Sequence, residues 1–118
     1  MSNIDIIKSN FQENQKINSI SSGQILESID TATSKILSMI DSSGKLLTCG
    51  NGGSSGDAQH IASEFINRFE SERKPLPAIS LNSDTATLTS IANDYGYQYV
   101  FSKQIKAIGN PDDILMVF

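Results

Sequence analysis

His60 and Glu64 are the residues whose types and spacing best suit chemistry. They lie four positions apart in Asp-Ala-Gln-His-Ile-Ala-Ser-Glu-Phe, residues 57–65. On a helix, such a pair shares one face. An imidazole nitrogen and a carboxylate oxygen on one face can bind zinc or act as an acid–base pair. An ordinary helical pair is the alternative. Because the chain has no second histidine, further zinc ligands would have to come from beyond Phe118 or from another subunit.

A glycine-rich segment directly precedes this predicted helix and follows a short apolar run. It reads Gly-Asn-Gly-Gly-Ser-Ser, residues 50–55, and is called the glycine loop below. Backbone N–H groups at such a loop and helix start attract anions. We therefore expect a phosphate or sugar at residues 51–55, held by these N–H groups and by the hydroxyls of Ser54 and Ser55. A tight strand-to-helix turn without a ligand is the alternative.

Two familiar nucleotide-binding motifs do not account for the glycine loop. A nucleoside-triphosphate loop needs a lysine after its last glycine, and none follows here. The dinucleotide fingerprint matches at Gly50 and Gly52, but Ser55 stands where its third glycine belongs. The loop is therefore better suited to a small phosphorylated molecule than to a nucleotide cofactor.

Asn93, Asp94 and Arg68 are weaker candidates. Asn93 and Asp94 end a predicted short helix after the second strand, where they can approach the carboxyl ends of parallel strands; a simple helix stop is the alternative. Arg68 lies one turn beyond Glu64 and could balance its carboxylate or meet a phosphate, although a surface or interface ion pair explains it as well.

The elements that must position these residues alternate along the chain. Apolar spacing and turn residues predict helices over residues 1–22, 24–41, 55–69, 85–92 and 97–108, and strands over 45–49, 78–81 and 114–118. Such alternation gives a parallel sheet with helices on both faces. We expect a three-layer α-β-α, flavodoxin-like fold with strand order 2-1-3. The third strand would need further neighbours, so we expect the chain to be the N-terminal part of a longer protein.

Composition limits the class of protein. The chain has 118 residues, 38% of them hydrophobic, and a net charge of −4 with nine scattered Lys and Arg. Binding to the phosphate backbone of nucleic acid needs a concentrated basic face on the protein, so these scattered charges argue against a nucleic-acid partner. No apolar run approaches the ~18 residues of a membrane span. The single cysteine, Cys49, fits a reducing compartment, and we expect a cytoplasmic location.

Four segments together resemble the phosphoheptose isomerases, which belong to the sugar-isomerase (SIS) domain superfamily. They are Cys-Gly-Asn-Gly-Gly-Ser at 49–54, the His60–Glu64 segment at 57–65, Asn-Arg-Phe at 67–69, and Ile-Ala-Asn-Asp-Tyr-Gly-Tyr at 91–97. The resemblance covers about residue 23 to the last residue. It implies that residues 23–118 are the N-terminal part of a SIS domain, and the helix that the apolar pattern predicts over residues 1–22 would precede it as an N-terminal helical segment.

The resemblance also implies an activity and a set of site residues. The family converts sedoheptulose 7-phosphate to D-glycero-D-manno-heptose 7-phosphate, an aldose–ketose isomerisation that begins synthesis of the heptose of lipopolysaccharide. It implies a homotetramer with active sites between subunits and one zinc per subunit. By match of motif, the substrate-binding residues are Asn51, Gly52, Gly53, Ser54, Glu64, Asn93 and Asp94. The zinc ligands are His60 and Glu64, and the catalytic residue is Glu64.

The family's second, serine-rich phosphate loop and its late glutamine and histidine ligands are absent from these 118 residues. We therefore expect the chain alone to be inactive. A carboxylate at Glu64 suits the chemistry, because proton transfer through an enediol needs a base beside carbon and a stabiliser for the oxyanion.

Two other functions remain open. Replication-initiator-associating proteins share this fold and a Gln-His…Asn-Arg-Phe-Glu segment, here Gln59, His60 and residues 67–70. They act by tetrameric protein contacts and lack a glutamate at the position of Glu64, so that residue favours the enzyme. The segment 67–70 and Leu-Pro-Ala-Ile at 76–79 favour the scaffold. A sugar-phosphate sensor without turnover is the third possibility.

Overall fold

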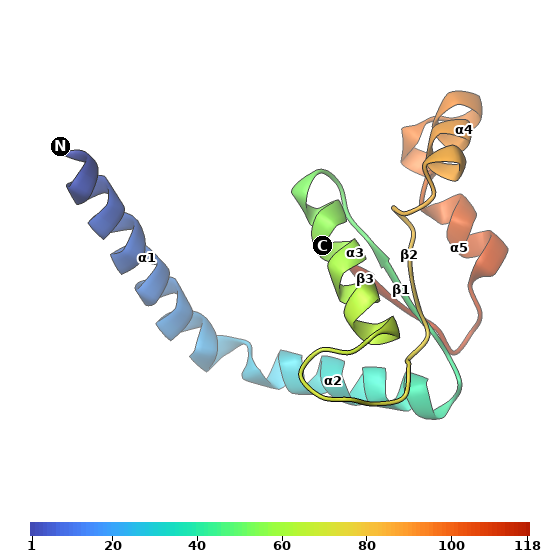
Figure 1. Cartoon of the computed structure of the whole chain (residues 1–118), viewed down its shortest axis with the longest axis horizontal. Coiled ribbons are helices and arrows are strands. Elements are labelled where there is room, and N and C mark those ends of the chain that lie inside the picture. Colours follow the sequence, from blue (N-terminus) through green and yellow to red (C-terminus); the bar gives the residue numbers. More distant parts are fainter. The chain divides into compact units, whose positions relative to one another are not determined.

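The computed structural model describes all residues from Met1 to Phe118 and divides into two compact units, Met1–Lys35 and Ile36–Phe118. Figure 1 labels the helices and strands. In chain order they are α1 (Asn3–Gln24), α2 (Leu26–Asp41), β1 (Leu46–Cys49), α3 (Gly53–Ile66), β2 (Ala78–Ser80), α4 (Thr85–Tyr95), the 3-10 helix η1 (Tyr97–Tyr99), α5 (Ser102–Ile108) and β3 (Ile114–Val117).

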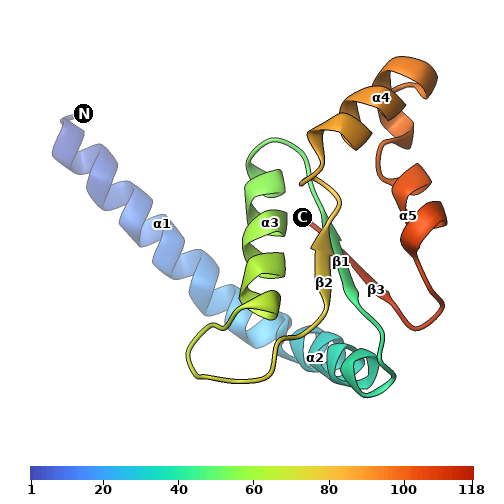
Figure 2. The same ribbon diagram turned by 45° about the vertical axis from the view of Figure 1, so that its right-hand side comes forward.

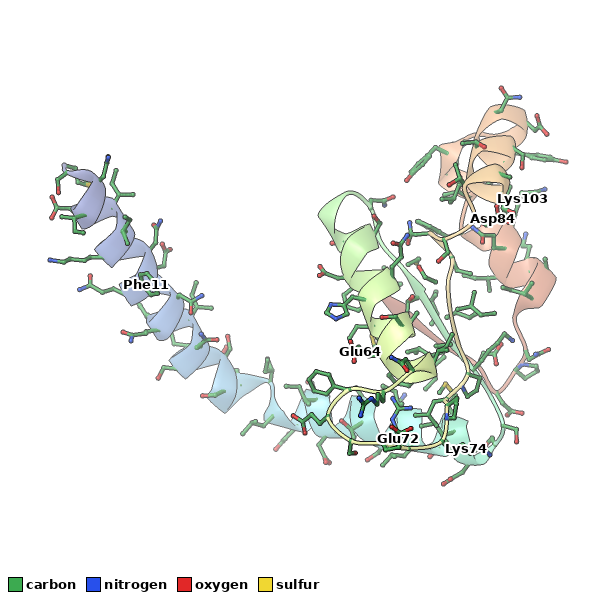
Figure 3. The ribbon with its side chains drawn as sticks, in the orientation of Figure 1. Phe11, Glu64, Glu72, Lys74, Asp84 and Lys103 are labelled. Atoms are coloured by element: carbon green, nitrogen blue, oxygen red, sulfur yellow. The ribbon has the colours of Figure 1, made fainter.

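The N-terminal unit contains the predicted first helix, α1. It begins with a capping box, in which the Ser2 hydroxyl accepts from the Asp5 N–H and the Asp5 carboxylate accepts from the Ser2 N–H. None of its residues is buried. Its apolar side chains are exposed, and Phe11, labelled in Figure 3, is 70% accessible. Neither α1 nor any other helix is long and apolar enough to cross a membrane.

The second unit is built on a three-stranded parallel sheet in the order β2-β1-β3. Figure 2 shows the three strands side by side, with α3 and α5 on opposite sides. In the register, Leu46 of β1 pairs with Ala78 of β2 and with Ile114 of β3. The predicted topology is confirmed, with β1 in the middle.

Period-two alternation along β1 separates two small cores. Leu46 packs with Met39 at the end of α2, Ala62 of α3 and Ala78 of β2. Leu47 and Cys49 point to the other face, where Leu81 and partly buried residues of the α5 region cover them. Burial raises the pKa of the Cys49 thiol. The sheet therefore has helices on both faces, as the α/β prediction required.

Thr48 links β1 to α3 inside the core. Its side chain is fully buried, and its hydroxyl donates to the Ala58 carbonyl at 2.7 Å. A buried hydroxyl needs such a partner. This bond holds the helix that carries His60 and Glu64 against the central strand.

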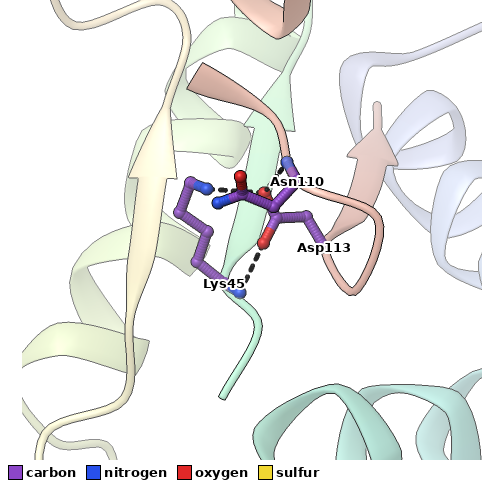
Figure 4. A network of polar contacts seen from close by, with 3 residues as sticks. All are labelled: Lys45, Asn110 and Asp113. Atoms are coloured by element: carbon purple, nitrogen blue, oxygen red, sulfur yellow. Dashed lines mark hydrogen bonds and ion pairs between the residues drawn. The ribbon is translucent and has the colours of Figure 1, made fainter. Parts of the chain in front are cut away.

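Lys45, Asn110 and Asp113 fix the start of β1 beside the turn before β3 (Figure 4). The Asp113 carboxylate accepts from the Lys45 N–H at 2.9 Å, the Lys45 ammonium at 2.5 Å and the Asn110 N–H at 2.7 Å. Burial of the carboxyl raises its pKa, but these bonds outweigh that effect, so the pKa of Asp113 lies below its usual value.

Three predicted helices need correction. The helix predicted over 55–69 is α3, which starts at Gly53, directly after Gly52 with its φ of 58°, and ends at Ile66. The helix predicted over 85–92 continues to Tyr95 and stops at Gly96, whose φ is 108°. The helix predicted over 97–108 is broken into η1 and α5, and the buried Val100 lies between them.

Candidate functional site

The glycine loop follows the carboxyl end of β1. Asn82, in the segment after β2, holds it through hydrogen bonds. The Asn82 carboxamide accepts from the Gly50 N–H at 3.0 Å and donates to the Gly50 carbonyl at 2.8 Å. A Cβ at Gly50 would lie 2.5 Å from the Ser54 carbonyl oxygen. Glycine is therefore required where the loop folds back against the start of α3.

The loop presents backbone donors that the protein itself does not use. The N–H groups of Gly52 and Gly53 have no intramolecular hydrogen-bond partner, and no side chain caps α3. The Ser55 hydroxyl donates to the Gly52 carbonyl at 2.7 Å, whereas the Ser54 hydroxyl makes no hydrogen bond. Of the two hydroxyls expected to meet an anion, only that of Ser54 is uncommitted.

His60 and Glu64 lie together on α3, as their spacing predicts. His60 Nε2 and Glu64 Oε1 are 3.2 Å apart, and the two side chains are 72% and 29% exposed. Figure 3 shows Glu64 on this helix. The Glu64 carbonyl and the Phe65 carbonyl accept from the Arg73 guanidinium, which closes the C-terminal turn of α3.

The His60–Glu64 pair fits part of a zinc site. Two ligands on a tetrahedral zinc with bonds of about 2.0–2.1 Å lie roughly 3.3 Å apart, close to the 3.2 Å between these donor atoms. No group of three His, Cys, Asp or Glu side chains lies close enough together to hold a metal. The chain therefore offers a nitrogen and an oxygen donor of the types that zinc takes, with no third such side chain beside them.

Asn93 and Asp94 lie in the last turn of α4, where the Asn93 amide donates to the Asp94 carboxylate at 2.9 Å. Just beyond them, the Tyr97 hydroxyl donates to Asn51 Oδ1 at 2.5 Å. This contact joins η1, the short helix that follows α4, to the glycine loop. The two segments that sequence motifs selected independently are therefore neighbours in space.

Other candidates lie outside this arrangement. Arg68 makes an exposed ion pair with Glu72 at 3.5 Å rather than with Glu64. A cavity of about 520 Å³ is lined by residues of β2, α4 and α5 and of the turn before α4, including Asp84 and Lys103 (Figure 3), and by none of the glycine loop.

Sequence reasoning missed Asn82, Tyr97 and Arg73, which hold the loop and the helix end. Tyr97 stands in the motif at 91–97, but no local spacing indicates its partner 46 residues away. Asn82 directly follows β2, and its polar side chain at a strand's carboxyl end was the one signal available.

The comparisons with known proteins identify the class. The SIS domain family model matches residues 11–118, and the chain belongs to this family. It is 49% identical over 112 residues to the phosphoheptose isomerase of Alkalilimnicola ehrlichii, covering 95% of this chain and 57% of that protein.

Solved structures give the same result. A phosphoheptose isomerase from Francisella tularensis matches with a TM-score of 0.94 and 42% identity, over 99% of this chain and 61% of that one. The structure from Neisseria gonorrhoeae matches with a TM-score of 0.89 and 35% identity, over 98% and 60%. The chain thus spans about 57–61% of these proteins. Among the functions left open by the sequence, these relatives favour the isomerase.

Proposed function

We propose that the protein, at its full natural length, isomerises sedoheptulose 7-phosphate to D-glycero-D-manno-heptose 7-phosphate. The observation that carries this proposal is the His60–Glu64 pair, 3.2 Å apart on the helix that begins at the glycine loop. An anion-binding helix start and a proton-transfer pair on one helix suit a phosphorylated sugar. The relatives named phosphoheptose isomerase support the choice of sugar.

Glu64 is the proposed base. It removes the proton from C1 of the ketose, the electron pair forms the C1–C2 double bond, and O2 gains a proton to give the enediol. Loss of the O1 proton then forms the aldehyde, and the proton returns to C2. Proton transfer by a positioned carboxylate contributes typically about 10²–10⁴-fold to a rate.

The glycine loop and the end of α4 are the proposed substrate-binding surface. The free N–H groups of Gly52 and Gly53 and the Ser54 hydroxyl suit oxygens of a phosphate or sugar. Asn51, Asn93 and Asp94 add amide and carboxylate groups that suit sugar hydroxyls. These assignments rest on motif match and on the proximity of the two segments through Tyr97.

We propose that His60 and Glu64 also supply two zinc ligands, one metal per subunit. When bound, zinc would stabilise negative charge on the sugar oxygens during enediol formation. We also propose a homotetramer; exposed apolar side chains on α1 and α2, such as Phe11 and Ile29, are of the kind that contacts between subunits cover. We also propose a cytoplasmic location, which the proposed reaction and the free Cys49 support.

Incubating the full-length protein with sedoheptulose 7-phosphate tests the proposed function. Proton NMR of the sugar should show D-glycero-D-manno-heptose 7-phosphate accumulating until the two sugars reach equilibrium. Zinc content and molar mass should be measured on the same sample. Absence of turnover with zinc present would contradict the proposal, and binding of a replication initiator by that inactive protein would establish the scaffold function.

A further inference from the structure

The side chain of Asn51 is held by a residue from a distant part of the chain. Tyr97 Oη lies 2.5 Å from Asn51 Oδ1. Amide N–H···O bonds are typically about 2.9–3.0 Å, whereas O–H···O bonds are shorter. The short separation therefore assigns the hydroxyl as donor and the carboxamide oxygen, not its nitrogen, as the atom facing Tyr97.

In this orientation, both N–H groups of the Asn51 amide nitrogen are free to donate hydrogen bonds. With Oδ1 occupied by Tyr97, the two Nδ2–H bonds point the other way, and no protein atom accepts them. The reversed carboxamide would turn an oxygen toward that space and repel phosphate or hydroxyl oxygens. A fixed orientation at this residue therefore determines whether the loop attracts or repels an oxygen-rich ligand.

The backbone just before Asn51 is fixed as well. Asn82 binds both the N–H and the carbonyl of Gly50 at 3.0 and 2.8 Å. With Gly50 held by Asn82, the Asn51 side chain still has rotational freedom about its own bonds. The hydrogen bond from Tyr97 restricts that rotation.

We propose that Tyr97 is a positioning residue that orients the Asn51 carboxamide to donate hydrogen bonds to an oxygen of the bound sugar phosphate. The proposal rests on the proposed function for the identity of the sugar. Tyr97 does not touch the reacting atoms. It reduces the cost of ordering Asn51 on binding, and preorganisation of this kind raises affinity.

Replacing Tyr97 with Phe in the full-length protein tests the proposal. The change removes only the hydroxyl of a side chain that is 58% exposed, so the core is unaffected. Calorimetric affinity for sedoheptulose 7-phosphate should fall about three- to tenfold, the loss of one hydrogen bond. The KM should rise with kcat little changed, because Asn51 binds the substrate and transition state alike.

Two comparisons separate positioning from a general structural effect. The Tyr99→Phe variant is a matched control, since Tyr99 is 46% exposed and its hydroxyl makes no hydrogen bond. It should bind as the unaltered protein does. In an Asn51→Ala background, Tyr97→Phe should cause no further loss, because the residue through which it acts is gone.

Equal affinity of Tyr97→Phe and the unaltered protein would overturn the proposal, as would an undiminished loss in the Asn51→Ala background. Either result with normal turnover would leave the proposed isomerase intact. An unaltered protein that binds the sugar phosphate without converting it would refute the isomerase alone, and the affinity comparison would still decide the role of Tyr97. A protein that does not bind the sugar phosphate would overturn both.

Discussion

Replacing Asp113 with Ala should destabilise the protein, because this nearly buried carboxylate anchors the start of β1. Its side chain is only 6% exposed and accepts three hydrogen bonds, two from backbone N–H groups and one from the Lys45 ammonium. Each bond to a charged acceptor contributes about 1.5–3 kcal/mol, and the losses do not add fully because Lys45 can turn toward water. We expect the free energy of unfolding to fall by about 2–4 kcal/mol.

Urea unfolding followed by circular dichroism measures this change at matched protein concentration. The Asp112→Ala variant is the control, because Asp112 is exposed and its side chain makes no hydrogen bond; it should change stability by less than about 0.5 kcal/mol. The Asp113→Asn variant, which keeps one acceptor oxygen, should lie between the two. Equal midpoints for the Asp113→Ala and Asp112→Ala variants would refute the proposed anchoring of β1 to the turn before β3.

The Asp113 carboxylate should also make the stability of the protein fall at low pH. Because the pKa of Asp113 is lower in the folded protein than its usual 3.8, the unfolded chain binds the proton first as the pH falls. The stabilisation is therefore complete above that usual value and is lost as the pH drops through the lowered folded pKa. The stability gap between the unaltered protein and Asp113→Asn should narrow below pH 3.8. A gap that widens there would contradict this sign.

Two further changes test how α3 is held. Thr48→Val removes the buried hydroxyl that donates to the Ala58 carbonyl but keeps the volume of the side chain, and chemical unfolding should show a loss of about 1 kcal/mol in the free energy of unfolding. Arg73→Met removes the guanidinium from the last carbonyls of α3 and should cost about 1–2 kcal/mol. Arg68→Met, which breaks only an exposed ion pair, should cost no more than about 0–1 kcal/mol, and thermal unfolding of both variants compares them.

The sequence was sufficient for the order of the elements because local patterns specify them. Apolar runs at β1 and β3 and helical spacing along α2 are short-range signals, and the glycine loop after β1 marked the strand at which the sheet reverses direction. Placing the reversal at β1 predicted the observed strand order β2-β1-β3. Boundaries were less accurate, because Gly52 and Gly96 adopt positive φ values that spacing does not reveal.

The sequence was sufficient to select the candidate residues of the site, but not the long-range contacts that bring them together. His60 and Glu64 share a helix face, so a four-residue spacing was enough to pair them. The contact of Tyr97 with Asn51 joins residues 46 positions apart and depends on where α4 ends. Arg73 reaches the end of α3 across an irregular segment without a periodic pattern. Such long-range contacts depend on tertiary packing, which one sequence does not encode in any local spacing.

The turnover of a Glu64→Gln variant of the full-length protein tests the central claim most directly. Glutamine keeps the size and hydrogen bonding of the side chain but cannot accept the C1 proton as a base. If Glu64 is the base, isomerisation of sedoheptulose 7-phosphate should fall by roughly 10²–10⁴-fold, with molar mass unchanged and zinc content measured on the same sample. The Glu70→Gln variant, altered at an exposed glutamate beyond α3, should keep normal turnover. Full activity of Glu64→Gln would contradict the assignment of Glu64 as the base.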